Sequence, residues 1–225
     1  MPDAYIVRHC SPTLAGLKTG NMFTVKQGKE ATVTDLRSVN RRITKYGLRM
    51  IPLRRNGEDV LLYLYCPERL KKDLNHPEAQ RILSQKGYNI QDSEQCVAQV
   101  AEHLRTDASF PHEIGLFLSY PPEDVLGFMV HPKQGVKAVG CWKVYGDKEK
   151  AEQTFRKYDA CTAIYQKAVS GGKSLEQLIV CEGAWYYTPG CYDLNNVVLE
   201  ALRLVNQGSF KPHPSKPNGL FRWGY

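Results

Sequence analysis

Two apolar segments on either side of an Asn-Gly dipeptide place the strongest constraint on the fold of this 225-residue chain. The segments are 49–53 and 60–65, and Asn56-Gly57 lies between them. Asn-Gly is the pair that a two-residue hairpin turn favours, because the turn needs backbone conformations with positive φ. The sequence therefore predicts a β-hairpin, whose second strand ends at Cys66-Pro67 because proline has no N–H for a strand ladder.

Helical patterns fill most of the remaining chain. After Asp147, apolar residues recur at spacings of three and four, which predicts a helix to about residue 169 that Asp147 caps and Gly171-Gly172 ends. Ser11-Pro12 has the pattern of an N-cap followed by proline at the first helical position, which predicts a helix through about residue 25. Further helices are predicted from Thr34 to a stop at Gly47, and at 67–74, 77–86, 93–105, 122–130 and 194–205.

Short apolar segments complete the pattern. Residues 114–118 and 139–145 are predicted as strands, and 175–181 fits either a helix or a strand. A helix joins the two predicted strands, so a parallel pairing between them stays open. The irregular order of elements predicts an α+β fold, a mostly helical single domain with a β-hairpin and a small mixed sheet. We expect this domain to span residues 1–206 and the proline-rich segment 207–225 to form a flexible tail.

Composition indicates a cytoplasmic protein. No apolar run approaches the roughly 20 residues that a membrane helix needs, and the N-terminus lacks the charged and apolar regions of a signal peptide. Seven cysteines include no C-x-x-C pair, and an odd number cannot all pair within one chain. Reduced thiols in a cytosol account for these features, so we expect a cytoplasmic protein with no membrane contact.

The net charge of +7 comes from one segment. Between residues 37 and 55 the chain has seven basic residues and no acidic one, which leaves 23 basic against 23 acidic residues elsewhere. The seven are Arg37, Arg41, Arg42, Lys45, Arg49, Arg54 and Arg55. Three of them are four residues apart on a predicted helix, and others lie on the adjoining hairpin, so the sequence predicts a basic patch.

Such a patch predicts a binding or accessory protein that engages an anionic partner, either an acidic protein or a nucleotide-like ligand. Nucleic acid is disfavoured as the partner because the chain has no recognisable nucleic-acid-binding motif. The alternative is a solvated charged surface with no partner. Oligomeric state and cofactor cannot be inferred from the sequence.

A thiol- or metal-dependent enzyme or redox protein is the competing interpretation. Cys10 follows Arg8 and His9 at a predicted helix start, and both a helix N-terminus and nearby cations favour the thiolate. The alternative for Cys10 is a packing role with no reactivity.

His112 and Glu113 form a second candidate site, as an acid/base pair or as metal ligands together with His9, Cys10 or Cys141. No H-x-x-x-H or C-x-x-C spacing supports a metal, so no metal site is predicted. Neighbouring residues in a strand also point to opposite faces. Glu113 accepting backbone hydrogen bonds while His112 orients a loop is the structural alternative.

Four stretches together resemble a known family: Arg-His-Cys-Ser-Pro-Thr-Leu-Ala-Gly at 8–16, Pro-His-Glu-Ile-Gly at 111–115 with Tyr120-Pro121, Glu-Asp-Val-Leu-Gly-Phe at 123–128, and Trp-Lys-Val-Tyr-Gly at 142–146. The likeness is to an uncharacterised bacterial domain-of-unknown-function family, the family 3793 type, and covers roughly residues 5–172. The Pro-His-Glu motif is its most specific part. The family has no established activity, so the resemblance implies a bacterial cytoplasmic origin and assigns no site residue.

Overall fold

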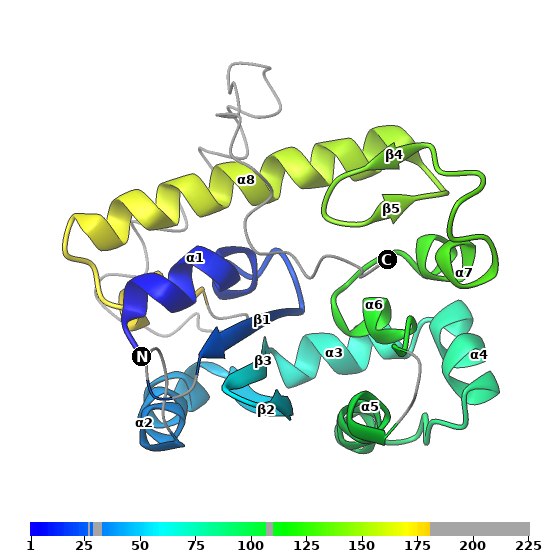
Figure 1. Cartoon of the computed structure of the whole chain (residues 1–225). Coiled ribbons are helices and arrows are strands. Elements are labelled where there is room, and N and C mark those ends of the chain that lie inside the picture. The colour runs from blue at the N-terminus through cyan, green and yellow to red at the C-terminus, as the bar shows by residue number, and fades with distance from the viewer. Residues whose placement is uncertain (27, 29–32, 107–109, 181–225) are drawn as a thin grey trace.

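The computed structural model describes residues 1–26, 28, 33–106 and 110–180 of the chain. In chain order the elements are α1 (Asp3–Leu14), β1 (Gly20–Lys26), α2 (Val33–Ile43), the 3-10 turn η1 (Thr44–Tyr46), β2 (Arg49–Asn56), β3 (Asp59–Tyr65), α3 (Pro67–Leu74), α4 (Pro77–Gln85), α5 (Ser93–Thr106), α6 (Ile114–Phe117), α7 (Pro122–Val130), β4 (Ala138–Val139), β5 (Lys143–Val144), α8 (Lys148–Ser170) and the 3-10 turn η2 (Glu176–Leu178) (Figure 1). Helices dominate and the strands form small sheets, so the predicted α+β class is confirmed. The predicted helix 194–205, the domain boundary at 206 and the tail 207–225 lie outside the described residues.

A three-stranded sheet in the order β1-β3-β2 lies at the centre of the fold. Both of its pairings are antiparallel, so the sheet is not the mixed one that the sequence predicted. The predicted hairpin joins β2 to β3, and Asn56 pairs with Asp59, so the two turn residues are Gly57 and Glu58. Gly57 has φ +58°, the positive φ that such a turn requires at its first position.

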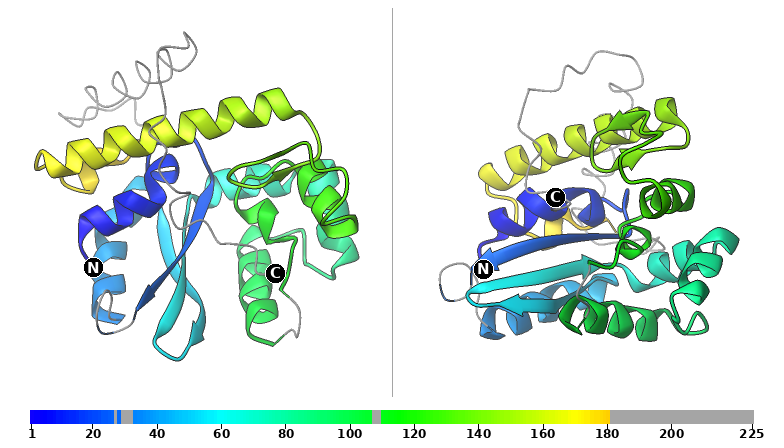
Figure 2. Two further views of the ribbon diagram at one scale, coloured as in Figure 1. Left: turned by 45° about the horizontal axis from the view of Figure 1, so that its top comes forward. Right: turned by 45° about the vertical axis from the view of Figure 1, so that its right-hand side comes forward.

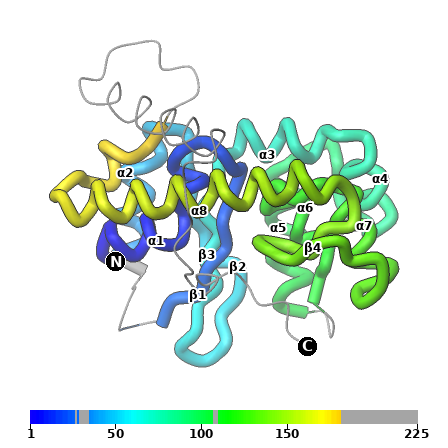
Figure 3. Tube along the Cα trace, turned by 90° about the horizontal axis from the view of Figure 1, so that it is seen from above, coloured from blue at the N-terminus to red at the C-terminus, as the bar shows by residue number. Residues whose placement is uncertain are grey.

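The central strand β3 is buried on both faces and separates two apolar cores. Leu62 and Leu64 pack with α1, α2 and the C-terminal part of α8, whereas Tyr63 and Tyr65 pack with α3 to α7. This division follows from the two-residue period of a strand, which sends alternate side chains to opposite faces. Helix α8 runs along α1 and continues toward the β4–β5 hairpin, so it spans both halves of the molecule (Figures 2 and 3).

Local capping signals predicted several elements correctly. Proline occupies the first position of α3, α4 and α7, and these helices match the predicted ranges to within one residue. Asp147 caps α8, since its Oδ1 accepts a hydrogen bond of 3.0 Å from the Lys150 amide. Gly47 ends the helical segment of α2 and η1 with φ +76°. These signals depend on contacts within about four residues, which a sequence displays directly.

The predicted helix starting at Ser11 is wrong. Helix α1 begins at Asp3, Pro12 lies in its last turn, and the chain from Gly20 to Lys26 forms strand β1. The apolar spacing decides this, because Ile6, Cys10 and Leu14 are four residues apart and all are fully buried. A proline in the last turn removes one backbone hydrogen bond, which this burial outweighs.

The two other predicted strands also differ from the structure: the first is a helix, and the second is replaced by two shorter strands. Residues 114–117 form the short helix α6, because a short apolar run does not distinguish a buried strand from a buried helix. Segment 139–145 turns back on itself, and β4 and β5 pair as a two-residue antiparallel ladder. Both segments lie in the described part of the chain, and they do not pair with each other. The parallel pairing that the sequence left open is therefore not formed. No helix among the described residues is long and apolar enough to cross a membrane.

Candidate functional site

A cleft of about 340 Å³ opens between the α1–β1 loop, α3, the α6–α7 connection and α8. We call it the lysine cleft. Its polar lining residues are Lys18, Thr19, Arg69, Lys72, Asp73, Ser119 and Tyr158. The loop 16–20 supplies one wall, and its conformation decides how the central residue, Lys18, is placed.

Glycine 16 makes this conformation possible. Gly16 has φ +72°, and the amides of Gly16 and Leu17 donate to the carbonyls of Thr13 and Pro12, which is the Schellman ending of a helix. An added Cβ at Gly16 would lie 2.3 Å from Nη2 of Arg69, and the Arg69 guanidinium donates to the Gly16 carbonyl. The turn therefore reverses the chain at the end of α1 and brings the next residues against the core.

Lys18 is the central residue of the cleft. Its side chain is 3% exposed, and its Nζ lies 5.3 Å from the ring centroid of Tyr120 and 5.9 Å from that of Tyr158. In the part of the chain that the structure describes, this Nζ has no hydrogen bond or ion pair. Burial lowers the pKa of Lys18 to about 8, although the nearby thiols of Cys141 and Cys10 favour its charged form. In the described chain this buried ammonium therefore has aromatic rings and thiols near it but no carboxylate, which compensates incompletely for its lost hydration.

A hydroxyl–carboxylate network forms another part of the lining of the lysine cleft. Oδ2 of Asp73 accepts hydrogen bonds from the hydroxyls of Thr19, at 2.6 Å, and Ser119, at 2.9 Å. The Ser119 hydroxyl also accepts a 2.8 Å hydrogen bond from the Thr19 amide. Ser119 has φ +57° and is the single non-glycine residue with positive φ in the described chain. Such a conformation is uncommon for a residue with a side chain, and here it ends α6, where the Tyr120 amide donates to the Gly115 carbonyl.

Among the described lining residues of the cleft, cationic side chains outnumber anionic ones. Lys18, Arg69 and Lys72 line it, against the single carboxylate of Asp73 among the described lining residues. One oxygen of Asp73 already accepts two hydrogen bonds, so this carboxylate is directed toward hydroxyl groups. Polar donors and concentrated positive charge in a concave site are the arrangement that favours a small anion.

Cys10 does not lie where the sequence predicted. It occupies the interior of α1, away from the helix N-terminus, and is fully buried. Burial raises the pKa of its thiol, so the predicted stabilisation of a thiolate by a helix start is wrong. Cys10 and Cys141 both influence Lys18 electrostatically, so these two of the proposed catalytic partners approach the cleft.

The histidines of the predicted catalytic set lie in other surroundings. The His9 ring packs 5.2 Å from the Phe23 ring, and the His112 ring packs 4.9 Å from the Phe128 ring. Burial lowers the pKa of His112. Glu113 is buried and accepts a 3.0 Å hydrogen bond from the Tyr88 hydroxyl. No group of three or more metal-ligating residues occurs in the described chain.

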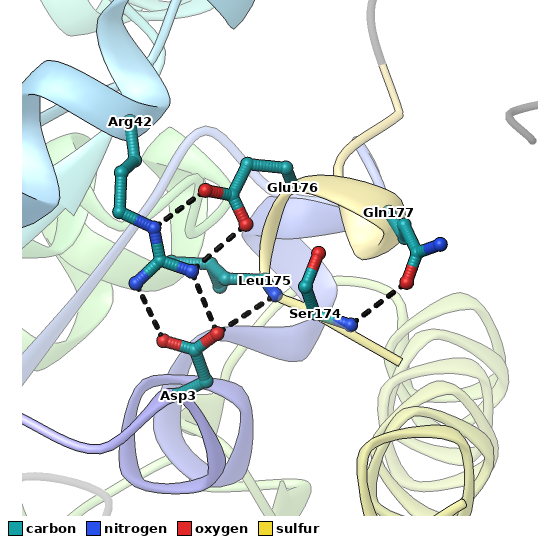
Figure 4. Close-up of polar contacts among 6 residues, drawn as sticks. All are labelled: Asp3, Arg42, Ser174, Leu175, Glu176 and Gln177. Atoms are coloured by element: carbon teal, nitrogen blue, oxygen red, sulfur yellow. Dashed lines mark hydrogen bonds and ion pairs between the residues drawn. The ribbon is translucent and has the colours of Figure 1, made fainter. Parts of the chain in front are cut away.

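Two of the seven predicted basic-patch residues are paired with carboxylates. The Arg42 guanidinium binds both oxygens of Asp3, at 2.8 and 2.7 Å, and both oxygens of Glu176, at 2.5 and 2.8 Å (Figure 4). This double ion pair lowers the pKa of Glu176 to about 2 and also lowers that of Asp3. Arg49 pairs with Glu94 at 2.9 Å. Arg42 therefore connects α2 to α1 and η2 and is a structural residue.

The remaining five basic residues have no ion pair within the described residues. Arg37 and Arg41 are exposed on α2, four residues apart. Lys45 places its Nζ 5.1 Å from the ring centroid of Tyr46, and Arg55 donates to the Gly57 carbonyl. The fifth is Arg54, which lies partly exposed on β2. The predicted patch thus retains part of its charge.

Replacing Arg42 by Gln should destabilise the protein by roughly 1–3 kcal/mol, because two partly buried carboxylates lose their shared partner. The effect should be largest at neutral pH. A carboxyl group whose folded-state pKa is lowered contributes stability above its unfolded pKa, and this contribution is lost as the pH falls from 4.5 toward 2. Arg41→Gln, at an exposed neighbouring position, is the control, and urea unfolding at pH 7 and pH 3 is the measurement. Equal stabilities of the two variants at pH 7 would contradict the structural role of Arg42.

The sequence interpretation missed the lysine cleft. The available signal was Lys18-Thr19 between Gly16 and Gly20, directly after an apolar helix. A side chain added at Gly20 would lie 2.4 Å from the Tyr63 ring, so both glycines meet another element closely. That signal is weak by itself, because the partners of Lys18 come from distant parts of the chain.

No curated protein and no solved structure matches this chain. A family model described as a protein of unknown function (DUF3793) matches residues 6–179. The match contains all the residues that line the lysine cleft, and it confirms the resemblance that the sequence motifs indicated. The chain belongs to the DUF3793 family.

Proposed function

We propose that the protein binds a small anionic molecule, bearing a phosphate or carboxylate group, in the lysine cleft. The observation that carries this proposal is the ammonium group of Lys18, which is buried without an anionic partner in the described chain. Burying a charge is unfavourable unless it is paired, so an anion at this position supplies the missing interaction. The volume of about 340 Å³ suits a metabolite-sized ligand.

The other cleft residues support the same ligand class. Arg69 and Lys72 add two cationic side chains from one helix, α3, and Tyr158 adds a hydroxyl from α8. Arginine binds phosphate and carboxylate in a planar bidentate manner, whereas lysine acts as a point charge. The hydroxyls of Thr19 and Ser119 donate to one oxygen of Asp73, so this carboxylate already has hydrogen-bond partners in the cleft.

Adding inorganic phosphate, pyrophosphate, citrate or a nucleoside monophosphate to the full chain tests this proposal. A ligand at 100 times its dissociation constant stabilises a protein by about 2.7 kcal/mol, which raises the Tm of a chain of this size by roughly 5–10 °C. Lys72→Gln should weaken binding of the active anion about tenfold, a loss of about 1.4 kcal/mol. Thermal shift and titration calorimetry are the measurements.

The matched control is Lys71→Gln. Lys71 is exposed beside Lys72 on α3 and does not line the lysine cleft. Its substitution removes the same charge from the same helix, so it should leave binding unchanged. Equal weakening in both variants would show a general charge effect and would contradict the cleft. Absence of stabilisation by all four anions would also overturn the proposal.

The exposed part of the predicted basic patch supports a second candidate function, binding of an acidic protein surface. Arg37 and Arg41 favour it, since both are exposed and unpaired within the described chain. Binding of poly-L-glutamate across a salt series tests this function. Substituting both arginines by Glu should abolish binding, and Lys72→Gln should leave it intact; unchanged affinity of the double variant would remove this function. Arg42 is left unchanged in this test because it holds Asp3 and Glu176.

We also propose that the protein is located in the bacterial cytoplasm. Cys10, Cys66, Cys96, Cys141 and Cys161 are free thiols in the structure. Free thiols are typical of reducing compartments, which supports this location. A small anionic metabolite would be available there.

A further inference from the structure

Lys18 has the surroundings of a reactive amine. The rings of Tyr120 and Tyr158 flank its Nζ, and both tyrosines are themselves more than nine-tenths buried. The thiols of Cys10, from α1, and Cys141, from the β4–β5 turn, also act on this amine electrostatically, and burial raises the pKa of both thiols, so they stay neutral at pH 7. No carboxylate of the described chain pairs with this amine.

This environment favours the neutral form of the amine. With its pKa lowered to about 8, Lys18 carries roughly 300-fold more free amine at pH 7 than an exposed lysine. Only the neutral amine has a lone pair available for attack on carbon. Desolvation of a lysine in an apolar pocket is a known way of making it nucleophilic.

We propose that Lys18 forms an imine with the aldehyde or keto group of an anionic carbonyl compound bound in the lysine cleft. The inference rests on the proposed function, because Arg69 and Lys72 must first hold the anionic group of that compound. The ligand class comprises α-keto acids and phosphorylated aldehydes, which share a carbonyl carbon beside a carboxylate or phosphate. Cations of α3 would bind the anion, and Lys18 would react with the carbonyl.

The step balances without any oxidant or reductant. The nitrogen lone pair forms a C–N bond with the carbonyl carbon while the C=O π electrons move to oxygen. One proton then moves from nitrogen to oxygen, which gives a carbinolamine. The nitrogen lone pair expels the hydroxyl group, which takes up one proton and leaves as water, and the product is a protonated imine.

Tyr158 is placed to donate a hydrogen bond to that hydroxyl group. It lines the cleft next to Lys18, and burial raises the pKa of its hydroxyl, so the group stays protonated at neutral pH. Its hydroxyl makes one long contact of 3.4 Å, to the Leu17 carbonyl. A weak hydrogen bond of this length leaves the hydroxyl able to turn toward a ligand. Tyr158 therefore orients the departing hydroxyl group through a hydrogen bond, and solvent supplies the proton.

Reductive trapping on the full chain tests the inference. The protein is incubated at pH 8 with pyruvate, with pyridoxal 5′-phosphate or with propionaldehyde, and sodium borohydride then converts any imine into a stable secondary amine. Peptide mapping by mass spectrometry locates the adduct. We expect Lys18 to be labelled at least about tenfold faster than Lys71 by an anionic compound, in line with its larger share of free amine. Labelling by neutral propionaldehyde should be slower than by the anionic probes.

The arms of the experiment separate the alternatives. Preference for pyruvate assigns the α-keto acids, and preference for pyridoxal 5′-phosphate assigns the phosphorylated aldehydes. Equal labelling of Lys18 by propionaldehyde and by the anionic probes overturns the ligand class. Equal labelling rates of Lys18 and Lys71 overturn the reactive lysine.

Two variants show whether a lost adduct results from the missing amine or from misfolding. Lys18→Met should lose the adduct and Lys71→Met should retain it, with circular dichroism to confirm that both fold. The pH profile of labelling in the unmodified protein should have a midpoint near 8, which requires no variant. A midpoint above 10 would contradict the inference. If anions bind but Lys18 gives no adduct, the inference fails while the proposed function stands; if adducts form but no anion stabilises the protein, the proposed function fails.

Discussion

Replacing Lys18 by Met is expected to make the protein more stable at neutral pH. The pKa of Lys18 is lowered from 10.5 to about 8, which corresponds to about 3 kcal/mol of unfavourable free energy when the amine is charged. Cation–π contacts with the rings of Tyr120 and Tyr158 offset roughly 1 kcal/mol of this unfavourable free energy at these distances. Methionine keeps the apolar stem and removes the charge. We therefore expect a gain of about 2 kcal/mol, or a Tm increase of roughly 4–8 °C.

The size of this stabilisation depends on pH, whereas its sign stays the same. Between about pH 8 and 10.5 the unfolded chain keeps the proton of Lys18 that the folded chain has lost, so the unfavourable contribution diminishes as the pH rises. From pH 7 to pH 9 the advantage of Lys18→Met should fall by about 1 kcal/mol. Urea unfolding of both proteins in reducing buffer measures this difference.

Lys71→Met is the control for this substitution, since Lys71 is exposed on α3. It should change stability by less than about 0.5 kcal/mol. A Lys18→Met protein that is less stable than the unmodified chain at pH 7 would show that the aromatic contacts outweigh the lost hydration. Stability gained together with binding lost is the pattern of a residue retained for function.

Replacing Asp124 by Ala should produce the largest loss of stability among single changes near the site. Asp124 is buried in α7 and accepts three hydrogen bonds, from the indole of Trp142 at 2.6 Å and from the amides of Tyr145 and Gly146, each at 2.7 Å. Alanine leaves all three donors without their acceptor. We expect a loss of about 3 kcal/mol, measured by urea unfolding with an unchanged m-value.

The neighbouring Glu123→Ala is the control, because Glu123 is exposed in the same helix turn. The Asp124 variant should also bind the cleft ligand less tightly. Trp142 packs 4.9 Å from the ring of Tyr120, and Tyr120 in turn flanks Lys18, so a loosened β4–β5 hairpin disturbs one wall around the amine. Equal stability of the Asp124 and Glu123 variants would contradict this account of the hydrogen bonds.

Prediction from the sequence succeeded where a structure depends on nearby residues. The hairpin near Asn56-Gly57, the proline starts of α3, α4 and α7, and the Asp147 cap of α8 all rest on contacts within a few positions. It failed at Ser11-Pro12, where a local capping pattern competed with an apolar face that tertiary burial favoured. It also failed at 114–117, where a short apolar run fits either secondary structure.

Sequence-based prediction was less successful for the candidate site than for the secondary structure. Counting charges identified a basic segment, but two of its members, Arg42 and Arg49, are paired with carboxylates that lie far away in the sequence. Glu176 is 134 positions from Arg42, and no local pattern shows that they meet. Cys10 and Cys141 were chosen for their reactivity, whereas burial raises the pKa of both thiols and lowers that of Lys18 close to them.

The sequence by itself determined the α+β class, the helical segments that carry clear caps, and the net positive charge. Only the tertiary structure decided which cations are neutralised and which one is buried. Thr19 and Ser119 are 100 positions apart, and Leu17 and Tyr158 are 141 apart, yet all four lie around one amine-lined cleft. Burial and electrostatic pairing are properties of the folded chain. The segments that pack around a charged side chain decide whether water reaches it and whether a carboxylate lies near it.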